Sequence, residues 1–130
     1  MIEVEQTTFA PPHGDCLAAC IASILELPLA DVPNLGCSTE WWQDTRDWLK
    51  PRNLDWLNWE HGPGAVVPRG YSILGADSPR GPWLHAVVCF DGAIVWDPSP
   101  DREQGVGTWR DWTVFVVLDP ARPVAIGAAD

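Results

Sequence analysis

Residues 14–27, GDCLAACIASILEL, join a short polar turn and a cysteine to almost three helical turns of small or branched apolar side chains. The apolar spacing predicts a helix over residues 16–26 with Asp15 as its N-cap. Pro28 should end this helix, because proline cannot continue the hydrogen-bond ladder. Cys16 stands at the first position, where unpaired amides and the helix dipole favour an anion. The stretch therefore predicts a buried helix that begins with a candidate nucleophile.

After this helix the pattern changes from helical to strand-like. Residues 28–33 fit a short turn, and Ser38 or Thr39 can cap a second helix over residues 39–49. Residues 50–64 are expected to be irregular, because they end in the breaker-rich sequence HGPG. Strands are predicted between later Pro and Gly clusters, at Ala65–Val67, Tyr71–Leu74, Leu84–Cys89, Ala93–Trp96 and Trp112–Leu118. This order predicts an α+β fold in which N-terminal helices pack on a C-terminal antiparallel sheet.

The charge balance excludes some classes of partner. The 130 residues carry 18 acidic and 8 basic side chains, a formal net charge of −10. Such a chain repels nucleic acid and anionic membranes, so we expect neither as a partner. The acids are spread from Glu3 to Asp130, which is typical of a solvated surface. A mimic of nucleic acid would instead need them on one continuous face.

The chain length and its apolar stretches indicate one cytoplasmic domain. A length of 130 residues fits a single domain over residues 1–130. The first five residues, MIEVE, are acidic, whereas a secretory signal starts basic and then becomes apolar. No stretch approaches the length of about 18 apolar residues that indicates a membrane span. We therefore expect a cytoplasmic location.

The four cysteines are expected to be reduced thiols in that compartment. Cys16 and Cys20 lie one helical turn apart, a spacing that suits neither a usual disulfide nor, by itself, a zinc site. His13 and Cys37 could complete a metal set with them, but no C-x-x-C spacing is present. We expect neither a metal nor an organic cofactor. Cys20 and Cys89 fit the pattern of buried structural cysteines.

A nucleophilic cysteine needs a base, and the chain has three histidines. His61 lies in the HGPG turn and is expected to be solvated, and His13 lies on a proline-rich approach. His85 opens the apolar strand LHAVVCF, where its imidazole can face a helix packed across the strand rim. The alternative is a core histidine satisfied by a backbone group.

The hairpin that follows His85 has two possible registers. A two-residue loop at Asp91-Gly92 would put His85 opposite Pro98, with Asp97 on the other face. A three-residue loop that includes Phe90 would pair Cys89 with Ala93 and put His85 directly opposite Asp97. In the second register Asp97 is close enough to accept an imidazole hydrogen bond. Such an acceptor fixes the tautomer of the imidazole and stabilises its charged form.

Two further features bear on a reaction site. Gln6 is the candidate side-chain donor that, with the Cys16 backbone amide, could stabilise an oxyanion; the alternative is an exposed glutamine.

Nine tryptophans indicate that large rings fill a small core. Trp41, Trp42 and Trp83 are the ones most expected to line a cleft.

The order Gln6, Cys16 at a helix start, His85 on a strand and Asp97 at the end of the next strand resembles the papain-like cysteine peptidases. Within that fold it is most similar to small bacterial leader peptidases that process double-glycine peptides. Their helix likewise begins around an Asp-Cys pair, and their third member is an Asp-Pro. The segments QTTF, GDCLAACIASILELPLADVPNL and HAVV-x-x-DG-x-x-x-x-DP also resemble uncharacterised small proteins of phages and bacteria. The resemblance spans residues 6–98.

The resemblance implies a papain-like, cysteine-dependent hydrolase, a peptidase or an amidase or isopeptidase, that acts on a peptide or protein through a thioester. Cys16 would attack, His85 would relay the proton, Asp97 would orient His85, and Gln6 would help to hold the oxyanion. Gln6 lies ten positions before Cys16, so either residues PPHG fold out as a loop or Gln6 is not the oxyanion donor. Leu17 stands where the leader peptidases often have glycine. The alternative is a catalytically inactive, acidic phage-type protein that keeps this fold and blocks a host partner.

Overall fold

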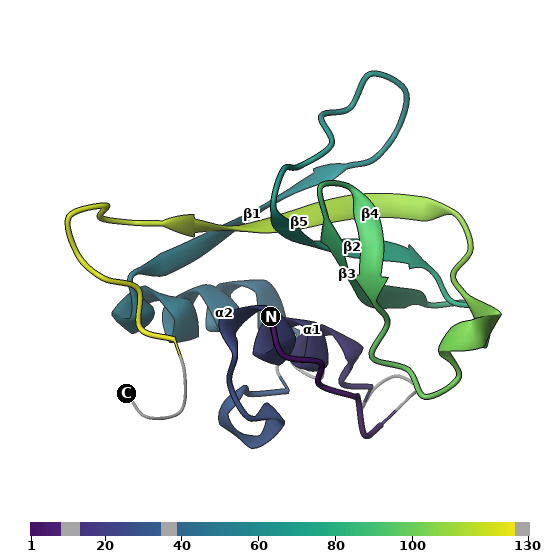
Figure 1. Cartoon of the computed structure of the whole chain (residues 1–130), viewed down its shortest axis with the longest axis horizontal. Helices are drawn as coiled ribbons and strands as arrows, with labels where there is room; N and C mark the ends of the chain where they lie inside the picture. Colours follow the sequence, from purple (N-terminus) through teal and green to yellow (C-terminus); the bar gives the residue numbers. More distant parts are fainter. Residues whose placement is uncertain (9–13, 35–38, 127–130) are drawn as a thin grey trace.

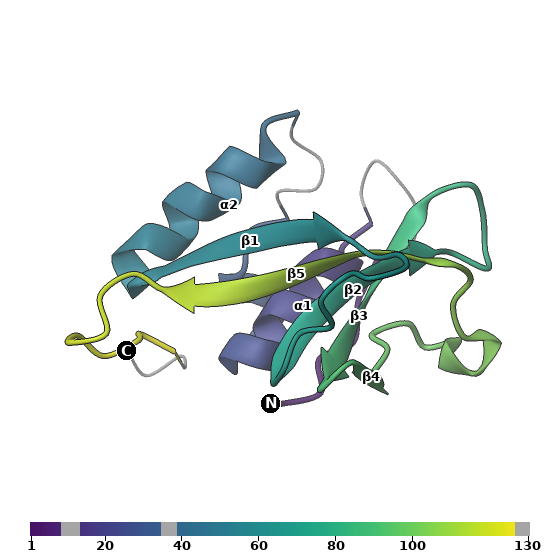
Figure 2. The same cartoon turned by 90° about the horizontal axis from the view of Figure 1, so that it is seen from above.

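A five-stranded antiparallel sheet carries two α-helices on one face (Figures 1 and 2). The computed structural model describes residues 1–8, 14–34 and 39–126. Its helices are α1 (Cys16–Leu25) and α2 (Trp41–Leu49), with short 3₁₀ turns η1 (Leu29–Asp31), η3 (Lys50–Arg52) and η4 (Arg102–Gln104). Its strands are β1 (Leu54–Glu60), β2 (Tyr71–Asp77), β3 (Leu84–Phe90), β4 (Ala93–Trp96) and β5 (Trp109–Val117). The predicted α+β class is confirmed.

Helix α1 forms where its apolar periodicity predicted it and is the most deeply buried helix of the described chain. Its C-terminus is set by Glu26, which adopts the left-handed conformation with φ 58°. The next amide, that of Leu27, donates to the carbonyl of Ala22, so the helix closes two residues before Pro28. The predicted turn after Pro28 is η1.

Helix α2 begins later than predicted. Its first residue is Trp41, and Glu40 holds the N-cap position, so the prediction of Thr39 as the cap is wrong. Ser38, the other predicted cap, lies outside the described residues. Thr45 and Leu49 are the buried residues of α2, and the helix packs against β1.

Strand β1 was expected to be irregular, and that expectation is wrong. Its alternating burial places Leu54 and Trp56 in the core, while its charged residues obscured the strand pattern. One of them, Asp55, pairs with Arg46 of α2, and Asn58 donates to the carbonyl of Trp112 on β5. Asp55 and Asn58 are thus satisfied by partners on other elements. In the sequence alone, such polar residues favour a loop.

The predicted strand Ala65–Val67 is also wrong. These residues lie outside the ladders, and Val66 is 71% exposed. The carbonyl of Val66 accepts a hydrogen bond from the indole nitrogen of Trp59, so a side chain replaces a strand partner. The other predicted strands are present, with β2 and β5 longer than predicted and β4 as predicted.

The strand order β1-β5-β2-β3-β4 places the last strand, β5, in the interior of the sheet. Strand β5 pairs with β1 on one side and with β2 on the other, and it therefore connects the two halves of the sheet. The main core lies between the helices and the sheet, and a smaller cluster around Leu74, Val87 and Trp112 lies on the opposite face. Neither α-helix in the described ranges has the length and apolar character that crossing a bilayer would require.

Candidate active site

Cys16 is the first residue of α1 and is half-buried at the end of the helix that faces β3. Asp15 does occupy the predicted N-cap position, but its side chain makes no cap hydrogen bond to the helix. Instead its carboxylate accepts hydrogen bonds from the amides of Thr7 and Thr8 and from the Thr7 hydroxyl, at 2.9, 3.0 and 2.6 Å. Asp15 therefore ties the N-terminal segment, residues 1–8, to the residue next to the thiol.

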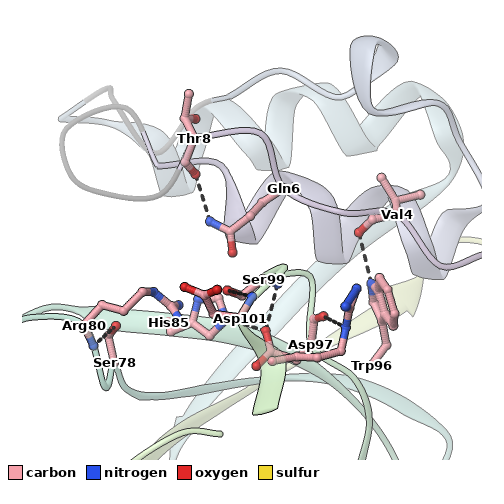
Figure 3. Close-up of polar contacts among 11 residues, drawn as sticks. Val4, Gln6, Thr8, Ser78, Arg80, His85, Trp96, Asp97, Ser99 and Asp101 are labelled. Carbon is pink, nitrogen blue, oxygen red and sulfur yellow. Dashed lines mark hydrogen bonds and ion pairs between the residues drawn. The ribbon is translucent and has the colours of Figure 1, made fainter. Parts of the chain in front are cut away.

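The N-terminal segment also reaches the end of β4. The backbone amide of Gln6 donates to the carbonyl of Pro98 at 2.9 Å. The indole nitrogen of Trp96 donates to the carbonyl of Val4 at 3.0 Å (Figure 3). On the other side, the amide of Val4 donates to the Ser23 hydroxyl of α1. The segment thus fastens the helix that carries Cys16 to the turn that carries Asp97.

His85 is the second residue of β3, and it is 3% exposed. Its Nε2 lies 2.7 Å from Oδ1 of Asp97, and its imidazole lines the same cavity as Cys16. Burial lowers the pKa of His85, but the hydrogen bonds with Asp97 and Cys16 outweigh it and raise the pKa from 6.5 to about 9. The imidazole is therefore positively charged at neutral pH.

The predicted contact between His85 and Asp97 is present, but of the two possible loops the two-residue one forms, not the three-residue loop from which this contact was expected. Phe90 pairs with Ala93 around a two-residue loop, in which Asp91 and Gly92 have φ values of 51° and 82°. Positive φ at both positions matches the twist of a tight hairpin. A register shift between Val88 and Cys89 then pairs Val88 with Trp96, and Asp97 follows the strand end instead of lying opposite His85.

A local turn holds the Asp97 carboxylate in place. The amide of Ser99 donates to Oδ1 of Asp97 at 2.9 Å, the same oxygen that faces His85 (Figure 3). The guanidinium of Arg102 donates to the carbonyl of Asp97 at 3.3 Å and lies over the ring of Trp96. Because Asp97 is 8% exposed, the hydrogen bond between its carboxylate and His85 is shielded from water.

Gln6 is buried, which excludes the alternative of an exposed glutamine. Its Nε2 donates to the carbonyl of Thr8 at 2.8 Å, and its Oε1 has no hydrogen-bond partner within the described ranges. It is not among the residues that line the cavity at Cys16. One hydrogen of the Gln6 side-chain amide is already used by the bond to Thr8. The role of Gln6 as an oxyanion donor stays a prediction.

A cavity of about 770 Å³ opens beside Cys16 and His85. Trp41 and Trp42 line it as predicted, whereas Trp83 lines a separate hollow in the loop between β2 and β3. The floor of the cavity is the sheet, where small and polar residues gather: Asn58, Gly75, Ala86, Asp111 and Thr113. Leu17, the residue after the candidate nucleophile, also contributes to the wall.

Trp56 and Asp111 are among the lining residues that were not predicted from the sequence. Trp56 belongs to the strand that was predicted as irregular, and Asp111 precedes the predicted start of β5. The signal for Trp56 was the alternation of Leu54 and Trp56. No local signal marks Asp111, because its place in the cavity depends on the pairing of β5 with β2.

The other thiols differ from Cys16 in their surroundings. Burial raises the pKa of Cys20 well above its ordinary value and that of Cys89 to about 12, so both stay protonated. His13 and Cys37, the other members of the possible metal set, lie outside the described residues. Within residues 1–8, 14–34 and 39–126, no three His, Cys, Asp or Glu side chains form a group that could hold a metal ion.

The arrangement brings a sulfur and a charged imidazole to one cavity, and a buried carboxylate is hydrogen-bonded to the imidazole. Such an arrangement can move a proton between the sulfur and a bound molecule while the carboxylate keeps the ring oriented. The chain matches no protein-family model, no curated protein and no solved structure.

Proposed function

We propose that this chain is a cysteine-dependent hydrolase of papain-like architecture that cleaves an amide, isopeptide or related acyl bond in a peptide or protein. The observation that carries the proposal is that Cys16 and His85 line one cavity, with Nε2 of His85 2.7 Å from Oδ1 of the buried Asp97. Support for the papain-like architecture is the division between a helix that begins with the cysteine and an antiparallel sheet that carries the histidine.

The first step forms a thioester. The imidazolium of His85 stabilises the thiolate of Cys16, and the thiolate attacks the carbonyl carbon of the substrate. His85 then gives its Nδ1 proton to the leaving amine, and the carbon–nitrogen bond breaks. Water attacks the thioester, His85 accepts its proton, and the carbon–sulfur bond breaks to release the acid and restore the thiolate.

The oxyanion of each tetrahedral intermediate needs donors. The amide of Cys16 is in the first turn of α1, where backbone amides have no partner inside the helix. It therefore provides one donor near the sulfur. Gln6 is proposed as the second donor, which requires its amide to use the hydrogen that does not bind the carbonyl of Thr8.

Alkylation of Cys16 by iodoacetamide tests the proposal. A free cysteine loses roughly 100-fold in alkylation rate between pH 8 and pH 6, because its thiolate fraction falls. We expect Cys16 to react at pH 6 at least 10-fold faster than free cysteine. His85→Gln should remove this advantage, because the positive charge is lost. Peptide mass spectrometry locates the label, and buried Cys20 and Cys89 are internal controls.

Cys16 reacting no faster than free cysteine at pH 6 would overturn the hydrolase proposal. If Cys16→Ala also keeps every biological effect of the protein, the function is that of an inactive, acidic binding protein of the same fold. If Cys16 is activated, peptides, ubiquitin-like conjugates and muropeptides are the substrates to screen, with Cys16→Ala as the inactive reference.

A further inference from the structure

The floor of the cavity contains a carboxylate that the proposed reaction does not use. Asp111 on β5 lies across Gly75 of β2, so closely that a Cβ at position 75 would meet Oδ1 of Asp111 at 2.6 Å. Glycine leaves this space to the Asp111 carboxylate, and the neighbouring floor residue of β3 is the small Ala86. The sheet is thus built to admit the Asp111 side chain over its helix-covered face.

Asp111 lacks a positive partner in the part of the chain that the structure describes. Burial raises its pKa, and a hydrogen bond from Asn58 acts in the opposite direction. The adjacent Arg110 points elsewhere and forms an ion pair with Asp77. No lysine or arginine is among the residues that line the cavity. A half-buried carboxylate with one neutral donor leaves a free-energy cost that a bound cation would remove.

The aromatic wall of the same cavity also suits a cation. Trp42 and Trp56 are stacked with ring centroids 4.3 Å apart, and Trp41 meets them edge-on at 5.7 and 6.0 Å. Tryptophan is the ring whose face attracts ammonium and guanidinium groups most strongly. The aliphatic stem of a lysine or arginine side chain can lie along such rings while its charged end reaches an acid.

We propose that this cavity binds a lysine or arginine side chain of the substrate, with Asp111 as the specificity-determining residue and the tryptophans beside it. The inference rests on the proposed hydrolase function, because it places this side chain close to the bond that Cys16 attacks. The net charge of −10 favours the approach of such a cationic peptide.

Matched peptide acyloxymethyl ketones test the inference. The Cys16 sulfur displaces the acyloxy group as a carboxylate and forms a stable thioether. In each pair, one probe carries lysine and the other carries norleucine at the same position. One pair varies the residue next to the ketone, and a second pair varies the residue before it. We expect Cys16 to be labelled about 10-fold faster by the lysine probe at one of these positions, as a charge-assisted contact implies.

The variant Asp111→Asn should reduce this preference to about onefold while the rate with norleucine is kept, which also shows that the variant is folded. Glu103→Gln removes one exposed negative charge outside the cavity, and it should keep the preference. Equal rates with both probes in the unaltered protein, or an unchanged preference in Asp111→Asn, overturn the cation site and leave the hydrolase proposal standing. Failure of every probe to label Cys16 overturns both.

Discussion

At the level of single residues, two opposing effects act on the pKa of His85. Its burial alone would favour the neutral ring, yet the bonds to Asp97 and Cys16 hold it charged, with a pKa of about 9. In the unfolded chain a histidine titrates near pH 6.5. The protonated form is therefore bound more tightly in the folded state, and it contributes stability that is fully present below pH 6.5 and lost as the pH rises through 9.

We expect the free energy of unfolding to fall by about 1–3 kcal/mol between pH 6.5 and pH 9. Urea unfolding across this range measures the fall, and NMR titration of the His85 ring locates its pKa. Asp97→Asn removes the carboxylate, so burial should then dominate and lower the pKa of His85. A His85 ring that titrates at or below pH 6.5 in the unaltered protein would contradict this account.

At the level of elements, the N-terminal segment is the connection between helix and sheet. It bonds to Asp15 and Ser23 on the helix side and to Trp96 and Pro98 on the sheet side. The relative position of Cys16 and the pair His85–Asp97 depends on this connection, because neither α1 nor β4 alone fixes it.

Asp15→Ala should destabilise the protein by about 1–3 kcal/mol, since it removes a buried carboxylate that accepts hydrogen bonds from the backbone amides of Thr7 and Thr8. Urea unfolding measures the loss, and hydrogen exchange at these two amides should accelerate. Asp31→Ala, an exposed acid in η1, is the control and should change stability by less than about 0.5 kcal/mol. Equal stability of the two variants would show that the segment is not anchored through Asp15.

At the level of the whole molecule, negative charges outnumber positive charges. Exposed ion pairs such as Arg46–Asp55 and Arg110–Asp77 lie on its surface, but the excess of 10 negative charges remains. Salt weakens both the pairs and the overall repulsion. Exposed pairs contribute little each, so the loss of repulsion should dominate.

We expect the melting temperature to rise as NaCl increases from about 10 mM to about 300 mM, a range over which the screening length falls severalfold. Calorimetry at pH 7 measures the change, and sodium sulfate at equal ionic strength separates screening from salt-specific effects. A melting temperature that falls with NaCl would mean that the surface ion pairs outweigh the net repulsion.

Elements that depend on residues close together in the chain were predicted, whereas elements that depend on distant partners were not. Helix α1, the strand β4 and the approximate limits of β3 follow from spacing within a few residues, so a local pattern predicts them. Strand β1 does not, because Asp55 and Asn58 find their partners on α2 and β5. The contact of His85 with Asp97 was predicted, but its geometry was not, since the pairing of β3 with β4 shifts register between Val88 and Cys89.

By itself, the sequence determined an α+β chain with a cysteine at a helix start, a histidine on a strand and an Asp-Pro after the next strand, because these depend on local periodicity and turn chemistry. Only the tertiary structure decided that Asp111 and Trp56 share a cavity with Cys16. Their shared place in the cavity depends on β5 pairing between β1 and β2, and residues that are far apart in the sequence become neighbours only when this pairing forms.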